Sequence, residues 1–130
     1  MASTDHAAPV ALVVAEDAEA RHLASALFED SELSVVECES GEAALSALHR
    51  LGQKAALVFA NIPLPGLIDG VDLARLIRTH WPQVNVIVTS DDPADGRRPL
   101  PDGAVYMGKP WRALDVLMAA ERALPRPERV

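Results

Sequence analysis

The sequence predicts a doubly wound α/β domain, in which a five-stranded parallel sheet is covered by helices on both faces. Short, mostly β-branched apolar runs alternate along the chain with segments whose apolar residues recur at helical spacing. The runs are apolar at consecutive positions, as expected for strands that are buried on both faces of a parallel sheet. The 130 residues are 49% hydrophobic but only 4% aromatic, which favours one core of aliphatic side chains.

The elements can be placed in chain order. Five apolar runs are expected to be strands: Val10–Val14, 33–36, 55–59, 84–88 and 104–107. Four segments between and after them have helical spacing and are expected to be helices: Ala20, Leu23, Ala24, Leu27 and Phe28; Ala44, Ala47, Leu48 and Leu51; Leu73, Leu76, Ile77 and His80; and Ala113, Val116, Leu117, Ala120 and Leu124. Ser40 and Asp69 are expected N-caps, and Pro82 after Trp81 ends the third helix.

The stretch between the last two strands, residues 90–103, breaks the alternation. It is rich in proline, glycine and aspartate and has no apolar stripe, so a stable helix there would be costly. We expect a mobile loop with at most one helical turn, instead of a full fourth helix. Residues 1–9 and 125–130 are interpreted as tails around one domain that spans residues 10–124.

Composition excludes several functions. A net charge of -7 argues against general binding to nucleic acid, which needs a basic face. Cys38 is the single cysteine, so no internal disulfide can form, and the sequence contains no long apolar run or signal-peptide pattern. We therefore expect a cytoplasmic protein that does not bind a membrane.

Polar side chains follow four of the predicted strands. Glu16 and Asp17 follow the first, Asn61 the third, Thr89 the fourth and Lys109 the fifth. In a doubly wound sheet the functional crevice lies at the carboxyl ends of the strands, so these groups should meet at one edge. Two adjacent carboxylates suit a hard cation such as Mg²⁺, and a lysine opposite them can neutralise negative charge.

The sequence resembles the response-regulator receiver domains of two-component systems over nearly the whole chain. The resemblance rests on VVAED with the acidic pair, NIPLPGLIDG after the third strand, VIVTS and YMGKP. It implies a flavodoxin-like, CheY-like sheet with strand order 2-1-3-4-5 and a site where an aspartate accepts a phosphoryl group from a sensor histidine kinase. In this family Mg²⁺, held here by Glu16, Asp17 and the residue at position 61, assists the transfer.

The resemblance also implies roles for three further residues. Thr89 and Lys109 would bind the phosphoryl group, and Tyr106 would report its presence by swinging inward. A cis bond is expected between Lys109 and Pro110.

The sequence departs from the family where the acceptor aspartate is expected, because Asn61 stands there, four residues before Pro65. An amide is not a nucleophile at neutral pH, so phosphoryl transfer to Asn61 should fail. The amide also removes one anionic ligand, so Mg²⁺ should bind weakly or not at all. Either this is a natural pseudo-receiver, which we favour, or an acceptor aspartate was replaced by an inactivating substitution.

We therefore expect an atypical single-domain response regulator that acts through protein contacts and is not an enzyme. Its partner would be a sensor histidine kinase or another signalling protein, and it would be a monomer or a weak homodimer. The expected output surface combines the last two strands, the 90–103 loop and the final helix. A small flavodoxin-like enzyme is disfavoured, because the sequence shows neither a nucleophile nor a cofactor loop.

Minor features were assigned structural roles. The four histidines have no ligand spacing and are expected on helix surfaces, and Cys38 is expected to be half-buried. Arg97 and Arg98 are expected to be solvated, with a partner contact as the alternative. The segment from Pro65 to Gly70 should turn the chain beside the site.

Overall fold

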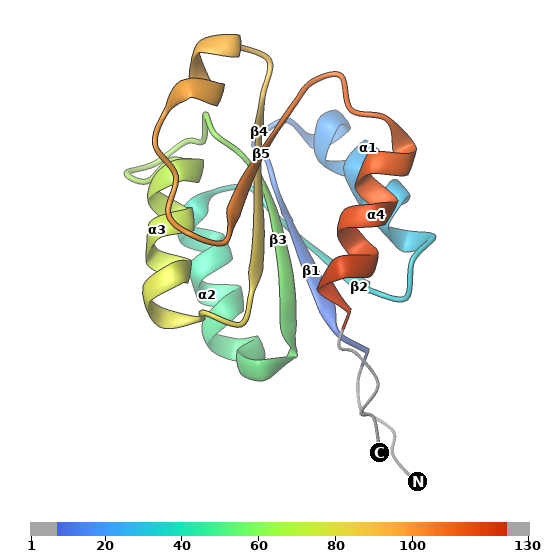
Figure 1. Ribbon diagram of the computed structural model, residues 1–130. Helices are drawn as coiled ribbons and strands as arrows, with labels where there is room; N and C mark the ends of the chain where they lie inside the picture. Colours follow the sequence, from blue (N-terminus) through green and yellow to red (C-terminus); the bar gives the residue numbers. More distant parts are fainter. Residues whose placement is uncertain (1–7, 125–130) are drawn as a thin grey trace, which may run out of the picture.

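The computed structural model, which describes residues 8–124, confirms the predicted fold (Figure 1). All neighbouring strands are parallel, and their order is β2-β1-β3-β4-β5. The strands are β1 (Val10–Val14), β2 (Ser34–Cys38), β3 (Ala55–Asn61), β4 (Asn85–Ser90) and β5 (Ala104–Gly108). The α-helices are α1 (Ala18–Glu29), α2 (Gly41–Leu51), α3 (Gly70–His80) and α4 (Ala113–Ala123). Two short 3₁₀ helices are η2 (Gly52–Lys54) and η3 (Pro93–Arg97).

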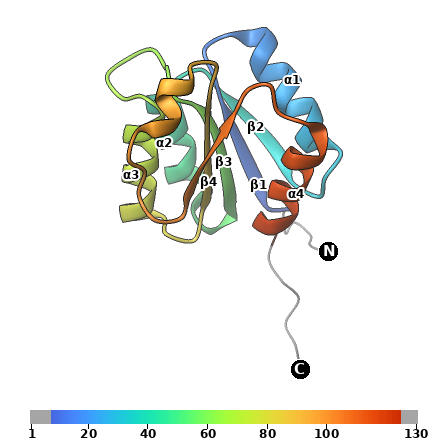
Figure 2. The ribbon, with the colours of Figure 1, turned by 45° about the horizontal axis from the view of Figure 1, so that its top comes forward.

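The helices form one layer on each face of the sheet, with α2 and α3 on one side and α1 and α4 on the other (Figures 1 and 2). Alternate strand residues point to opposite faces, so the core is divided by the sheet. Val58, Ala60 and Val88 belong to the cluster with α2 and α3, whereas Phe59 and Ile87 belong to the cluster with α1 and α4. This alternation decides on which face each polar residue at the strand ends lies.

Three strands extend two residues further at their carboxyl ends than their apolar runs predicted. β2 ends at Cys38, β3 at Asn61 and β4 at Ser90. The reason is that polar residues remain in the hydrogen-bonded ladder: Asn61 pairs with Thr89, and Ser90 pairs with Gly108. Candidate site residues are therefore held by the sheet itself.

The predicted helix starts and stops are confirmed. The Ser40 hydroxyl accepts a hydrogen bond from the Ala43 N–H, and Asp69 forms a reciprocal capping box with Asp72. The third helix ends at Trp81, before Pro82. Of the eighteen residues with helical spacing, nine are buried and six are partly buried. The single cysteine, Cys38, is more buried than expected, at 5% exposed.

Two apolar residues at helical spacing are not buried. Leu23 is 61% exposed and Ala113 lies on the surface, whereas the exposed position of His80 agrees with the expectation for the histidines. In α1 the buried face is rotated so that Arg21 is inside, only 8% exposed, where its guanidinium donates to two backbone carbonyls and to the Glu37 carboxylate. A charged side chain can be buried when it is paired in this way, which periodicity alone does not anticipate.

The expectation of a single turn between β4 and β5 is confirmed, since η3 is the only helical element between residues 90 and 104. Pro9, assigned to the N-terminal tail, accepts a hydrogen bond from the Ser34 N–H at 2.9 Å, so it is attached to the start of β2. The rest of that tail, residues 1–7, and the C-terminal tail, 125–130, lie outside the described residues. No helix within residues 8–124 is both long and apolar enough to cross a membrane.

Candidate functional site

Asn61 and Thr89 lie side by side at the carboxyl end of the sheet. They are register partners in β3 and β4, and the Ile62 N–H donates to the Thr89 carbonyl at 2.8 Å. Both follow by two positions residues that face α1 and α4, Phe59 and Ile87, so both side chains point to that face. Thr89 is 1% exposed. The two candidate residues therefore share one wall of the predicted crevice.

The acidic pair lies on the loop between β1 and α1, and Arg21 holds this loop in place. The Arg21 guanidinium donates to the Ala15 carbonyl at 2.9 Å and the Glu16 carbonyl at 3.3 Å, while Glu37 accepts from its Nε at 3.0 Å. The Asp17 carboxylate caps α1 by accepting from the Ala20 N–H at 2.8 Å. Glu16 and Asp17 are both exposed, so their remaining oxygens face solvent.

Lys109 reaches the same edge from the loop after β5. Asn61, Lys109 and Trp111 line a small cavity of about 10 Å³, together with the end of β1 and Ala15, which follows it. The Lys109 ammonium lies 3.9 Å from the Asp91 carboxylate and 5.9 Å from the centre of the Trp111 ring. The Lys109–Pro110 bond is cis, as expected. The predicted meeting of Asn61, Thr89 and Lys109 is thus observed.

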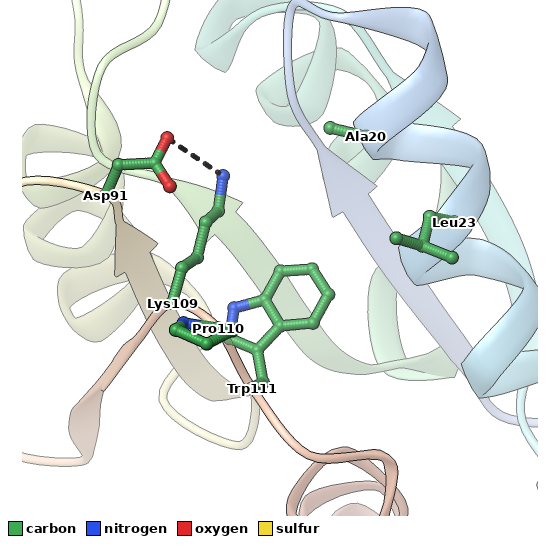
Figure 3. A pocket seen from close by; sticks show the side chains of 6 residues that line it. All are labelled: Ala20, Leu23, Asp91, Lys109, Pro110 and Trp111. Atoms are coloured by element: carbon green, nitrogen blue, oxygen red, sulfur yellow. Dashed lines mark ion pairs between the residues drawn. The ribbon is translucent and has the colours of Figure 1, made fainter.

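A larger cleft, of about 390 Å³, opens beside these residues (Figure 3). One wall is α1, with Ala20 and Leu23, and the other is the loop after β5. Figure 3 shows the Trp111 ring facing α1 across the opening, with Lys109 directed toward Asp91. The exposed Leu23 therefore lines a concave surface.

Trp111 is the direct side-chain partner of Thr89. Its indole Nε1–H donates to the Thr89 hydroxyl oxygen at 2.7 Å. The ring packs edge-on against Phe59, with centroids 5.2 Å apart, and Phe59 packs in the same way on Phe28. The indole is therefore held by aromatic packing in the position from which it donates.

Tyr106 lies on the opposite face of the sheet from Thr89. It packs with the α2 and α3 cluster, and its hydroxyl donates to the Ser90 carbonyl at 3.4 Å. Its ring lies so close to η3 that a Cβ on Gly96 would be 2.7 Å from it. The Ser90 hydroxyl donates to the Asp95 carboxylate, also in η3. Tyr106 therefore contacts the loop before β5 and not the Thr89 hydroxyl.

The loop from β3 to α3 turns beside the site, as expected. Gly66 has a φ of +90°, a conformation that glycine adopts without strain. The Leu67 N–H donates to the Glu42 carboxylate at 2.8 Å and holds the pKa of Glu42 below its usual value. At the end of the loop, the Gly70 N–H donates to the Ile62 carbonyl at 2.8 Å. The chain next to Asn61 is therefore fixed at both ends of this loop.

Arg98, which was expected to be solvated, instead binds the N-terminal end of α3. Its guanidinium donates to the Asp69 carboxylate at 3.0 Å. Burial raises the pKa of Asp69, but hydrogen bonds from the Asp72 N–H and Arg98 outweigh burial and leave that pKa below its usual value. Arg97 is exposed, in agreement with expectation. The β4–β5 segment is thus joined to the helix that follows the Asn61 loop.

Comparison with known proteins identifies the family. The model of the family described as response regulator receiver domain matches residues 11–120. The chain belongs to the response regulator receiver domain family. A search of curated protein sequences gives no significant match.

Solved receiver structures share this fold. A response regulator receiver domain protein from Clostridium thermocellum is 23% identical, with a TM-score of 0.78, covering 88% of this chain and 93% of that chain. The receiver domain of NtrX from Brucella abortus is 26% identical, with a TM-score of 0.73 and coverages of 88% and 97%. The receiver domain of the hybrid histidine kinase CckA is 23% identical, with a TM-score of 0.72 and coverages of 88% and 98%.

The carboxyl edge of the sheet carries a small set of oxygen donors that a magnesium ion could use. Among residues 8–124, no three histidine, cysteine, aspartate or glutamate side chains gather where they could hold a metal ion. The oxygen donors at this edge are the Glu16 and Asp17 carboxylates and the Asn61 amide, and one Asp17 oxygen already caps α1. Mg²⁺ keeps several waters and is usually bound through one or two carboxylates, so these donors suit the ion, with one anionic ligand fewer than an aspartate at position 61 would supply.

Two residues that contact the site were missed by sequence reasoning. The burial of Arg21 was missed because the apolar residues of its helix suggested a different buried face. Trp111 carried a signal, as a large aromatic directly after Lys109 and Pro110, but nothing in the sequence shows which atom its N–H meets.

Proposed function

We propose that this protein is an atypical receiver of two-component signalling that does not accept a phosphoryl group at Asn61 and acts through protein–protein contacts in the cytoplasm. The observation that carries the proposal is the place of Asn61, at the carboxyl end of β3 beside Thr89 and in one small cavity with Lys109. In this proposal Asn61 occupies the acceptor position, and its amide is not a nucleophile at neutral pH. No enzymatic activity is assigned to it.

The remaining family roles are proposed for residues that meet at the same edge. Thr89 and Lys109 would be the phosphate-binding pair, and Tyr106 the aromatic residue that responds to the state of the site. Glu16, Asp17 and the Asn61 oxygen would be the Mg²⁺ ligands. The formal charges of Glu16, Asp17 and Lys109 sum to only -1. Any Mg²⁺ should therefore bind weakly, at Asp17, with Glu16 directly or through water.

The proposed surface for output includes η3, β5 and α4. β5 is an edge strand, and Val105 on it is 57% exposed. Leu114 and Met118, one turn apart on α4, are 65% and 43% exposed. Such apolar side chains on the surface suit contact with a sensor histidine kinase or another signalling protein, with the receiver itself a monomer or a weak homodimer.

Phosphorylation with a small-molecule phosphodonor and Mg²⁺, followed by mass spectrometry, tests the acceptor assignment. The protein with Asn61 should gain no phosphoryl group at position 61, whereas Asn61→Asp should gain one, because Thr89 and Lys109 are in place. Asn85→Asp is the matched control, since Asn85 is an exposed asparagine at the opposite end of the sheet. Stoichiometric phosphorylation of Asn61 itself would refute the proposal.

The Asn61→Asp variant also tests the alternative, a phosphoryl-accepting receiver in which an aspartate had been replaced. If the variant is phosphorylated as fast as active receivers and then binds a kinase or output partner only in that state, the alternative is favoured. If its phosphorylation is slow and partner binding is independent of it, the pseudo-receiver is favoured. A folded variant that accepts no phosphoryl group would show that the site has diverged beyond position 61.

A further inference from the structure

We propose that Trp111 is a positioning residue that fixes the Thr89 hydroxyl in one orientation, in place of a phosphoryl group. The inference rests on the proposed function for the identity of Thr89 as the switch residue. It rests on the structure for the contact itself, the 2.7 Å hydrogen bond from the indole Nε1–H to Thr89 Oγ1.

The hydrogen bond has a defined direction, because an indole N–H can only donate. The Thr89 oxygen must therefore be the acceptor, and one of its two lone pairs is occupied. The hydroxyl hydrogen of Thr89 stays free to be donated elsewhere. Trp111 thus sets where the oxygen lies without removing the donor that a bound anion would use.

The surroundings make this orientation the favoured one. Thr89 is 1% exposed, so turning its hydroxyl away from Trp111 would cost this hydrogen bond at a position that water does not reach. Threonine is also restricted at χ1 by its branched Cβ. On the other side, the contact of Trp111 with Phe59 and the Lys109 ammonium 5.9 Å from its ring limit movement of the indole.

The consequence is a switch threonine that keeps one rotamer whether or not the site carries a phosphoryl group. A threonine that a phosphoryl group recruits must be able to occupy a second position in its absence. In this protein the hydrogen-bond partner of the Thr89 hydroxyl is Trp111, which is part of the polypeptide and always present. Trp111 therefore holds the Thr89 side chain in one orientation, which fits a receiver with no acceptor at position 61.

Side-chain NMR on the purified protein tests the hydrogen bond directly. Thr89→Val should speed hydrogen exchange of the Trp111 indole by about fivefold, the effect of one lost intramolecular hydrogen bond. Thr89→Ser, which keeps the hydroxyl, should restore slow exchange, and the indole of Trp81 is the internal reference. Equal exchange of the Trp111 indole in all three proteins would overturn the proposal.

The rotamer is tested separately by three-bond couplings to the Thr89 methyl carbon. They should report one χ1 state in the natural sequence and averaging in Trp111→Phe, which keeps a ring against Phe59 but loses the N–H. Trp81→Phe is the control and should leave them unchanged. A single χ1 state in Trp111→Phe would refute the positioning role. Neither measurement involves phosphoryl chemistry, so phosphorylation of Asn61 itself would count against the proposed function and leave the hydrogen bond and the rotamer to be judged by these measurements.

Discussion

Replacing Arg98 by glutamine should loosen the segment between β4 and β5. Its ion pair with Asp69 is short, at 3.0 Å, but the two side chains are 38% and 30% exposed, so solvent screens much of the attraction. We expect a loss of about 0.5–1 kcal/mol, at the upper end for a partly exposed pair, because the contact is also a charge-assisted hydrogen bond. That loss corresponds to about two- to fivefold faster local opening.

Amide hydrogen exchange measures this change. The amides of Asp95 and Arg98 are suitable probes, because each donates to a backbone carbonyl within the η3 turn. Arg97→Gln is the matched control, since Arg97 is the exposed neighbour and should leave exchange unchanged. Equal effects of the two variants, or no effect of Arg98→Gln, would refute the reasoning.

The same experiment tests the predicted mobility of residues 90–103. Side-chain contacts from Ser90, Arg98 and Tyr106 hold this segment, together with a weak 3.4 Å bond from Arg75 to the Pro99 carbonyl. We expect its amides to exchange faster than those of β4, because a single 3₁₀ turn supplies few backbone hydrogen bonds. Protection equal to that of β4 would contradict the prediction.

Three further predictions follow from the site. Asn61→Asp should tighten Mg²⁺ binding by about tenfold or more in calorimetry, because it adds one anionic ligand near a divalent ion, and unchanged affinity would contradict this. The free energy of unfolding measured in urea should fall below about pH 4, because Asp69, whose pKa is lowered in the folded state, becomes protonated there. Asp69→Asn should reduce this fall, and an identical pH profile of the two proteins would contradict the prediction. Burial raises the pKa of the Cys38 thiol to about 11, so at pH 8 it should react with a thiol reagent far more slowly than the unfolded chain, and equal rates would refute this.

The sequence was sufficient to predict the strands, their parallel arrangement and the edge at which polar groups meet. Apolar runs predicted the strands, but their carboxyl ends were placed too early, since Asn61 and Thr89 pair in the ladder despite being polar. Which polar groups become direct neighbours depends on register, and register depends on loops whose geometry has no periodic signal. The adjacency of Asn61 and Thr89 therefore required the structure.

The contacts around the site were the least predictable part. Arg21 is buried because two carbonyls of the acidic loop and the Glu37 carboxylate, in β2, accept hydrogen bonds from its guanidinium, and the apolar spacing of the helix does not reveal these partners. Arg98 binds Asp69 across 29 positions of the chain. Local composition suggested that Arg98 is solvated, because it records the cost of burying a charge but not the partners that offset that cost.

The end of β4 gives this receiver a mechanical property. Thr89 and Ser90 are adjacent, so their side chains point to opposite faces of the sheet; Thr89 is held by Trp111 near α4, and Ser90 by Asp95 in η3. A small rotation of this strand end about the strand axis would move the Thr89 and Ser90 side chains in opposite directions. A partner that contacts η3 would therefore act on the strand end through Ser90, and Trp111 would oppose that movement from the other face.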